Sequence, residues 1–159
     1  MIYIGVIGSG ECGIKIASLA EQVGREIARR GCALICGGRG GVMEAAARGA
    51  IEAGGLTVGI LPGRRREDGN HYLTVTLATG LGEARNAVIA CASDAIIAIA
   101  GGYGTLSEIG LALKMGKPVI GLCTWQVIWP GTDKAGFEKV DTASEAVDKA
   151  LLLAGWNKC

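Results

Sequence analysis

The sequence predicts a single α/β domain over residues 1–159, Rossmann-like and doubly wound, with a mainly parallel sheet and helices on both faces. Three observations predict this fold class. Short apolar runs alternate with amphipathic helical patterns along the chain, as in repeated strand–helix units. The runs are apolar throughout, which is typical of parallel strands buried on both faces. Finally, 27 glycines against only three prolines punctuate these segments.

Six continuous apolar runs of four to seven residues are predicted to be the strands. In chain order they are residues 2–7, 33–36, 57–61, 73–78, 94–100 and 117–122. A glycine or a proline directly follows the first, second, third and fifth of these runs, and both residue types favour the end of a strand.

Five segments with apolar residues three or four positions apart are predicted to be the helices. In chain order they are residues 15–30, 42–53, 82–92, 105–115 and 142–154. Gly31, Gly54 and Gly116 directly follow three of them, as glycine commonly does at a helix C-terminus. Thr142 and Glu145 have the spacing of a capping box at the start of the last helix.

Composition and charge exclude several classes of protein. The chain is 50% hydrophobic and 19% charged, which excludes a disordered chain, and its glycines follow no triplet repeat, which excludes collagen. The formal net charge of +1 gives no reason to expect a nucleic acid or an anionic membrane as a partner. The N-terminus does not have the pattern of a signal peptide, and no apolar run approaches the ~18 residues of a membrane span. We therefore expect a cytoplasmic protein.

The six cysteines are expected to be free thiols. They include no CxxC pair, and Cys32, Cys36, Cys91 and Cys123 lie in apolar segments, where a thiol acts as a small hydrophobic group. His71 is the single histidine, so a zinc site of cysteine and histidine has almost no ligands and no metal site is predicted.

Three glycine-rich loops are predicted to form a ligand site. Each follows a strand and precedes a helix: Gly8-Ser9-Gly10, Gly37-Gly38-Arg39-Gly40-Gly41 and Gly101-Gly102-Tyr103-Gly104-Thr105. The carboxyl ends of parallel strands meet at one edge of the sheet, where bare backbone and helix N-termini attract anions. We therefore expect a phosphorylated small molecule at these loops, with Met43 and Asn86 as further ligand-binding residues.

A dinucleotide enzyme is the less favoured interpretation of these loops. Gly8, Gly10 and Gly13 match the GxGxxG pattern, but that fingerprint also needs an acidic residue at the end of the second strand. The second strand ends in Cys36 and Gly37 instead, and the chain contains no GxxxxGK[ST] loop for ATP. The sequence therefore lacks the acidic residue of the dinucleotide fingerprint and the whole of the ATP-binding loop.

Arg85 and Glu108 are the candidate catalytic residues, and each has a second interpretation. Arg85 opens an apolar helix, where its guanidinium could hold a phosphate or could be solvated. Glu108 could stabilise a developing positive charge, or it could form a capping box with Thr105. The residues alone leave both alternatives open.

Other charged features are expected to lie outside the chemistry. Glu44 could hold a sugar hydroxyl, but we favour an interaction with the dipole of its helix. The run Arg64-Arg65-Arg66 could form a lid over an anionic ligand, but we favour a solvated loop over residues 63–72. Residues 124–139 also fit neither a strand nor a helix pattern.

Two stretches of the chain resemble the LOG-like family, whose members were once labelled lysine decarboxylases. They read GGRGGVMEAAARGA at 37–50 and AGGYGTLSEIGLALKMGKPVIGL at 100–122, and the resemblance extends from residue 2 to about 122. The best-known members are phosphoribohydrolases, which cleave the N-glycosidic bond of nucleoside 5′-monophosphates. The resemblance implies that Arg85 and Glu108 correspond to the active-site pair of those enzymes.

The sequence departs from the hydrolases at two positions. Ala100 replaces the Pro of the PGGxGT motif, and Asn86 follows Arg85 where the hydrolases carry Lys. The stretches TGLGEARN and AGGYGTLSE are more similar to a sister branch, the molybdenum cofactor carrier proteins, which bind a phosphate-bearing pterin. The resemblance therefore implies binding of a nucleotide or a phosphorylated pterin, with no required cofactor and with the molybdenum cofactor as a candidate carried ligand. Hydrolysis and a ligand-sensing role are the alternatives.

The resemblance also implies homodimers or higher homo-oligomers formed through the helices 82–92 and 105–115. These helices carry more apolar residues than one face against a sheet requires, namely Val88, Ile89, Cys91, Ile109, Leu111, Leu113 and Met115. The old decarboxylase label has no support, because no lysine follows the glycine loops in a context suited to a Schiff base with pyridoxal phosphate.

Overall fold

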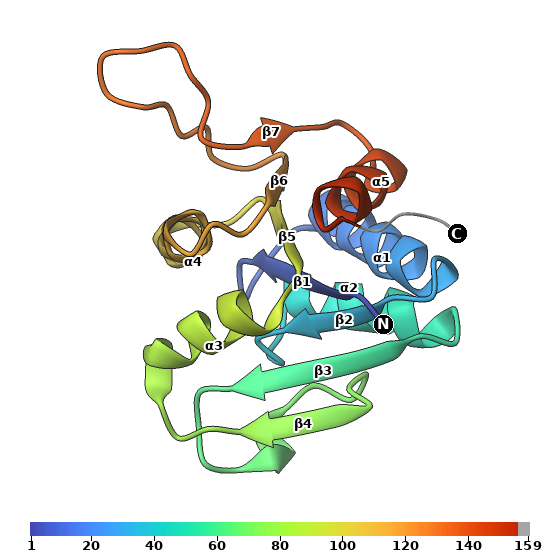
Figure 1. Ribbon diagram of the computed structural model, residues 1–159. Coiled ribbons are helices and arrows are strands. Elements are labelled where there is room, and N and C mark those ends of the chain that lie inside the picture. Colours follow the sequence, from blue (N-terminus) through green and yellow to red (C-terminus); the bar gives the residue numbers. More distant parts are fainter. Residues whose placement is uncertain (156–159) are drawn as a thin grey trace.

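The computed structural model describes residues 1–155, which form one sheet of seven parallel strands and five α-helices (Figure 1). The strands are β1 (Tyr3–Gly8), β2 (Ala33–Cys36), β3 (Leu56–Leu61), β4 (Val75–Ala78), β5 (Ala95–Ile99), β6 (Val119–Leu122) and β7 (Glu138–Lys139). The helices are α1 (Ile14–Arg29), α2 (Val42–Glu52), α3 (Arg85–Ala92), α4 (Tyr103–Lys114) and α5 (Ala143–Leu153). The predicted α/β, Rossmann-like fold is confirmed, and every predicted strand and helix is present.

The strand order places the three glycine-rich loops next to one another. The order is β4-β3-β2-β1-β5-β6-β7. Strands β2 to β4 are added on one side of β1 and strands β5 to β7 on the other, so the strand order reverses between β1 and β5. In the parallel register Gly8 is level with Ile99, and Val6 is level with Cys36. The carboxyl ends of β1, β2 and β5 are therefore neighbours at the switch point, where ligands bind in open α/β sheets.

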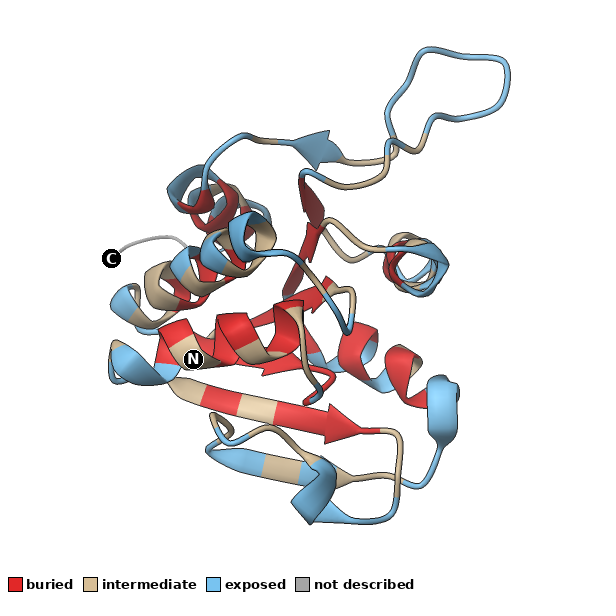
Figure 2. Ribbon diagram, turned by 180° about the vertical axis from the view of Figure 1, so that it is seen from behind, coloured by how far each residue is buried: buried red, intermediate tan, exposed pale blue. Residues whose placement is uncertain are grey.

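Helices cover both faces of the sheet, which explains why the strands are apolar throughout. Helices α1, α2 and α5 pack on one face, and α3 and α4 pack on the other (Figure 1). Within β5, Ile97 belongs to the core on the first face and Ile96 to the core on the second. All residues of β2 and β5 are buried, whereas the edge strand β4 alternates between exposed and half-buried residues (Figure 2).

Two local features differ from the predicted elements. The strand β7 was not predicted, because it consists of two exposed charged residues that pair with Ile120 and Gly121 at the sheet edge. Charged residues commonly protect such an edge from further pairing, and they leave no apolar run in the sequence. The predicted helix 82–92 begins as the 3-10 turn η2 (Gly82–Ala84), and α3 follows it. The other 3-10 turn is η1 (Arg66–Asp68).

The segment that joins β6 to β7, residues 123–137, extends away from the body of the protein as an exposed arm (Figures 1 and 2). Ile128 and Ala135 form an antiparallel bridge within it. The backbone enters the arm at Cys123 with a φ of 49°, a left-handed conformation that is uncommon for residues other than glycine.

The cysteines in the described part of the chain are free thiols. Cys32 and Cys36 are buried, and burial raises the pKa of the Cys36 thiol to about 11. Cys91 and Cys123 are exposed. Cys159 lies outside the described residues. Within residues 1–155, no helix is long and apolar enough to cross a membrane, and no cluster of metal-ligating side chains is present.

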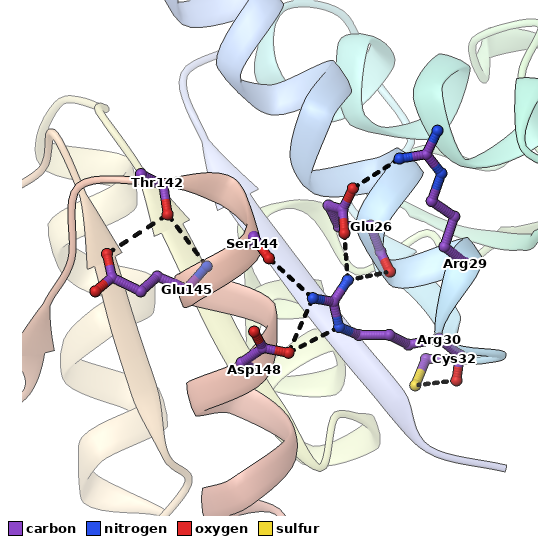
Figure 3. A network of polar contacts seen from close by, with 8 residues as sticks. All are labelled: Glu26, Arg29, Arg30, Cys32, Thr142, Ser144, Glu145 and Asp148. Carbon is purple, nitrogen blue, oxygen red and sulfur yellow. Dashed lines mark hydrogen bonds and ion pairs between the residues drawn. The ribbon is translucent and has the colours of Figure 1, made fainter.

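Arg30, at the C-terminal end of α1, joins that helix to α5 (Figure 3). Its guanidinium donates to Glu26 on its own helix, to Asp148 over 2.9 Å and to Ser144 over 3.0 Å. The hydrogen bond from Arg30 lowers the pKa of the Glu26 carboxyl. At the start of α5, Thr142 Oγ1 accepts a hydrogen bond from the backbone N–H of Glu145, as the capping box predicts.

Replacing Arg30 with Met should lower the free energy of unfolding by about 1–2 kcal/mol, because the partly buried Glu26 loses a charged hydrogen-bond donor and α1 loses its hydrogen bonds to Asp148 and Ser144. The neighbouring Arg29→Met is the matched control and should change it by less than about 0.5 kcal/mol, because the Arg29 side chain is itself 63% exposed. Urea unfolding at pH 7 measures both. Equal losses for the two variants would contradict the role assigned to Arg30.

The difference between wild type and Arg30→Met should also shrink in acid. A carboxyl with a lowered pKa contributes stability above its usual value of 4.5, and this contribution is lost as the pH falls through the pKa in the folded protein. Unfolding measured between pH 5 and pH 3 would test this.

Candidate functional site

A cavity of about 490 Å³ lies where the three glycine-rich loops meet. Its volume falls in the range of small-molecule sites. Most of the predicted site residues line it: Gly8, Ser9, Gly10, Gly40, Met43, Arg85, Asn86, Gly102, Gly104, Thr105 and Glu108. Residues from four segments of the chain thus converge on one volume at the switch point of the sheet.

Four predicted site glycines lie behind the cavity wall instead of lining it. A side chain at Gly37 would collide with the guanidinium of Arg85, and one at Gly101 would collide with Thr105. Gly41 has a φ of 64° and packs against the backbone of Ser9. Gly38 has a φ of 72° and packs against Leu61. A larger residue at Gly37, Gly41 or Gly101 would displace Arg85, Ser9 or Thr105, which line the cavity.

The cavity is bordered by helix N-termini that have no side-chain caps. Gly13, Gly41 and Gly102 are the N-caps of α1, α2 and α4, and a glycine has no oxygen to accept from the N–H groups of the first turn. Gly104 and Thr105 of the first turn of α4 line the cavity. Uncapped N–H groups and the helix dipole together favour an anion at this position.

The start of α4 decides between the two interpretations of Glu108. The helix begins at Tyr103 after the N-cap Gly102, so Thr105 is its third residue and not its cap. The alternative in which Thr105 and Glu108 form a capping box is therefore wrong. Glu108 belongs to the second turn and lines the cavity.

Arg85 is a buried cation without a hydrogen-bond partner. The residue is 5% exposed at the first position of α3, and its Nε and Nη1 atoms have no partner among residues 1–155. Its guanidinium lies against Gly37. Burial lowers the pKa of Arg85, and the carboxyls of Glu108 and Glu83 act in the opposite direction. The interpretation of Arg85 as a solvated helix residue is wrong.

Glu108 is a carboxyl whose protonation changes near neutral pH. Burial raises its pKa to about 7, the positive charge of Arg85 lowers it, and the negative charge of Glu83 raises it further. A carboxyl poised near 7 in a cavity can exchange a proton with a ligand, and such shifts are common at functional sites.

The sequence analysis missed three charged residues that line the cavity, namely Glu11, Arg39 and Glu83. Glu11 and Arg39 lie inside the glycine-rich segments GSGECG and GGRGG, so their place between loop glycines was the available signal. Glu83 precedes Arg85 by two residues on η2, and only the fold brings it to the cavity. Its Oε2 lies 3.5 Å from Nδ2 of Asn86.

The other charged features lie away from the cavity lining. Arg64, Arg65 and Arg66 are exposed, and Arg65 pairs with Glu67 and Asp68 of its own loop, as expected for a solvated loop. Glu44 is in the first turn of α2 and is absent from the residues that line the cavity.

The arm contacts the N-terminus of α4 next to the cavity. The indole Nε1 of Trp125 donates to the carbonyl oxygen of Gly102 over 3.1 Å, and its ring stacks on Tyr103 with 5.8 Å between the centroids. Thr124 Oγ1 donates to the carbonyl oxygen of Ala100. Ala100 has a φ of 47°, which a proline cannot adopt, so this backbone differs from one that begins PGG.

Comparisons with known proteins agree with this architecture. The model of the SLOG cluster4 family matches residues 1–150. The molybdenum cofactor carrier protein of Chlamydomonas reinhardtii has a similar structure, with a TM-score of 0.84 and 31% identity over 98% of this chain and 99% of that one. An uncharacterised protein of Archaeoglobus fulgidus is 47% identical over 95% of both chains.

A more distant relative is an enzyme. A cytokinin riboside 5′-monophosphate phosphoribohydrolase of Rhodococcoides fascians is 39% identical over 100 residues, which are 60% of this chain and 50% of that enzyme. The match thus spans half the length of the hydrolase.

The raised pKa of Glu108 should make the protein less stable as the pH rises from about 4.5 to 7. The unfolded chain releases this proton near the usual value of 4.5, whereas the folded protein retains it until about 7, so rising pH favours the unfolded state. Glu108→Gln should lack this loss and exceed the wild type by about 1–3 kcal/mol at pH 8. Urea unfolding at pH 5 and pH 8 measures the difference.

The control for this prediction is Glu11→Gln, because Glu11 is an exposed carboxylate of the same cavity. It should keep the pH dependence of the wild type. A Glu108→Gln variant with wild-type pH dependence would show that Glu108 ionises near its usual value.

Proposed function

Because the chain belongs to the SLOG cluster4 family, we propose that it binds a phosphorylated small molecule in the glycine-lined cavity. The observation that carries this proposal is the buried guanidinium of Arg85, whose Nε and Nη1 have no partner. Burying an unpaired charge is costly, and an anion in the cavity would compensate that cost. A phosphate suits the guanidinium because its oxygens accept hydrogen bonds from two nitrogens at once.

The phosphate would lie between Arg85 and the N-terminus of α4. There the backbone N–H groups at Gly104 and Thr105 and the hydroxyl of Thr105 can donate to its oxygens. The loops at Gly8 and Gly40 border the remaining volume, which would hold the body of the ligand. Their glycines present bare backbone, so a flat ring or a sugar can approach closely.

The carried ligand that we favour is a phosphorylated pterin of the molybdenum cofactor type, with a nucleotide as the other member of the same class. The similar Chlamydomonas protein is a carrier of the molybdenum cofactor. A carrier needs affinity and release without bond cleavage, and the donors described above supply affinity for the phosphate. Mass spectrometry of small molecules that co-purify with the native protein would identify the ligand.

Hydrolysis of nucleoside 5′-monophosphates is the second candidate function, and the position of Glu108 favours it. Its carboxyl lines the same cavity as Arg85, and its ionised form could stabilise the positive charge of an oxocarbenium-like transition state or orient the attacking water. The protonated form could instead donate to the departing base. Ala100 and Asn86, at the positions where the hydrolases carry Pro and Lys, make binding without turnover our first choice.

Homodimers are part of this proposal, because α3 and α4 expose apolar side chains on their outer faces. Val88 is 37% exposed and Met115 is 42% exposed, whereas Ile89 and Ile109 are buried against the sheet. Exposed apolar residues on neighbouring helices are typical of an interface between copies.

Arg85→Met should abolish the rise in melting temperature that ribose 5-phosphate produces. For the wild type this rise should be about 5–10 °C when the ligand is a hundredfold above its Kd. The free variant should melt at the same temperature as the wild type or higher, because it no longer buries an unpaired charge. Arg64→Met removes an exposed arginine outside the cavity and should respond as the wild type does. A destabilised Arg85→Met that still responds to the ligand would contradict the proposal.

The hydrolase candidate predicts release of free adenine from AMP by the wild type. Glu108→Gln should abolish that release and still show the AMP-induced rise in melting temperature, because the phosphate contacts remain. Chromatographic detection of the base tests both statements. If the wild type releases no base from AMP, GMP, IMP or CMP, the hydrolase candidate is excluded.

Size-exclusion chromatography with light scattering should give a mass of twice the 16.2 kDa of one chain or more. The double variant Val88→Glu, Met115→Glu should dissociate, because two charges on each face oppose association. A wild-type mass of one chain would contradict the homodimer.

A further inference from the structure

Asn86 is a second buried polar residue of the cavity that lacks a hydrogen-bond partner. It is 7% exposed, follows Arg85 on α3 and lines the cavity. Its Oδ1 has no partner among residues 1–155, whereas its Nδ2 points to Oε2 of Glu83 at 3.5 Å. A buried acceptor without a hydrogen bond costs free energy, so this oxygen points to a donor that a ligand supplies.

Glu83 fixes the orientation of the Asn86 amide. An ionised carboxylate only accepts hydrogen bonds, so it attracts the NH₂ group of the amide and repels its oxygen. The reversed amide would place two acceptors together and is disfavoured. The oxygen of Asn86 is therefore left as an acceptor.

The lining of the cavity thus contains groups of opposite hydrogen-bonding character. Arg85 and the N-terminus of α4 donate, as a phosphate requires. Glu83 and the Oδ1 of Asn86 accept, so they require adjacent donors on the ligand. A ring with a lactam N–H beside an amino group, as in guanine and in pterins, has such a pair of donors. The corresponding edge of adenine places an acceptor nitrogen beside its amino group and leaves one acceptor unpaired.

We propose that Glu83 and Asn86 determine the specificity of the cavity for phosphorylated ligands with a lactam N–H beside an amino group. This inference rests on the proposed function, because the phosphate held by Arg85 brings the ring to these two residues. Glu83 accepts from the ring directly and also positions the amide of Asn86. A bound adenine-like ring would leave one of these two protein acceptors without a donor, which lowers its affinity. The specificity therefore arises mainly from weaker binding of adenine-like rings.

Calorimetric binding of GMP, IMP, AMP and ribose 5-phosphate to the wild type, Asn86→Leu and Glu83→Gln tests the proposal. The wild type should bind GMP about tenfold more tightly than AMP, or ~1.4 kcal/mol, with IMP between them because it lacks the amino group. Both variants should bind GMP and AMP within about twofold of each other. Both should bind ribose 5-phosphate as the wild type does, which also shows that they are folded.

The contrary outcomes are distinct. Equal binding of GMP and AMP by a wild type that binds ribose 5-phosphate would overturn the specificity and leave the proposed function intact. Weaker binding of ribose 5-phosphate by both variants would assign Glu83 and Asn86 to the sugar and also overturn it. A wild type that binds none of the four compounds would overturn the proposed function itself, and the specificity with it.

Discussion

The burial of the Arg85 guanidinium without a partner is the constraint on which the site depends. The sheet places the start of α3 against the end of β2, and Gly37 is the residue that leaves room for the guanidinium there. Met43 of α2 and Glu108 line the same cavity, and the pKa of Glu108 is raised to about 7. A protein selected for stability alone would replace this arginine with an apolar residue. Under the proposed function, this arginine gives up stability for affinity toward an anion.

The topology explains why one short domain can assemble such a site. Because β1 lies between β2 and β5, three loops that are far apart in sequence reach the same edge of the sheet. The glycines of these loops serve two purposes. Gly37 and Gly101 admit the side chains of Arg85 and Thr105, whereas Gly102 and Gly104 face open space and leave the helix N-terminus accessible. The high glycine content therefore reflects both construction of the wall and access to it.

Much of the fold and of the candidate site could be predicted from the sequence, because apolar runs, helical periodicity and glycine-rich loops are local patterns. Continuous apolar runs identified six strands, and four of these, β1, β2, β5 and β6, contribute buried residues to both cores. The strand β7 could not be predicted, because Glu138 and Lys139 carry no apolar signal and pair only through their backbone. The role of Glu108 was open until the start of α4 was known, since a shift of three residues, from Gly102 to Thr105, decides whether Thr105 is the cap. Glu83 escaped prediction because its proximity to the cavity depends on tertiary structure.

The arm has a consequence for how one rim of the cavity is held. Trp125 and Thr124 bind the carbonyl oxygens of Gly102 and Ala100, which flank the left-handed turn into α4. The base of the arm is therefore attached, through these two hydrogen bonds, to the backbone that leads into the first turn of that helix. One rim of the cavity is thus held in part by side chains from a segment outside the sheet.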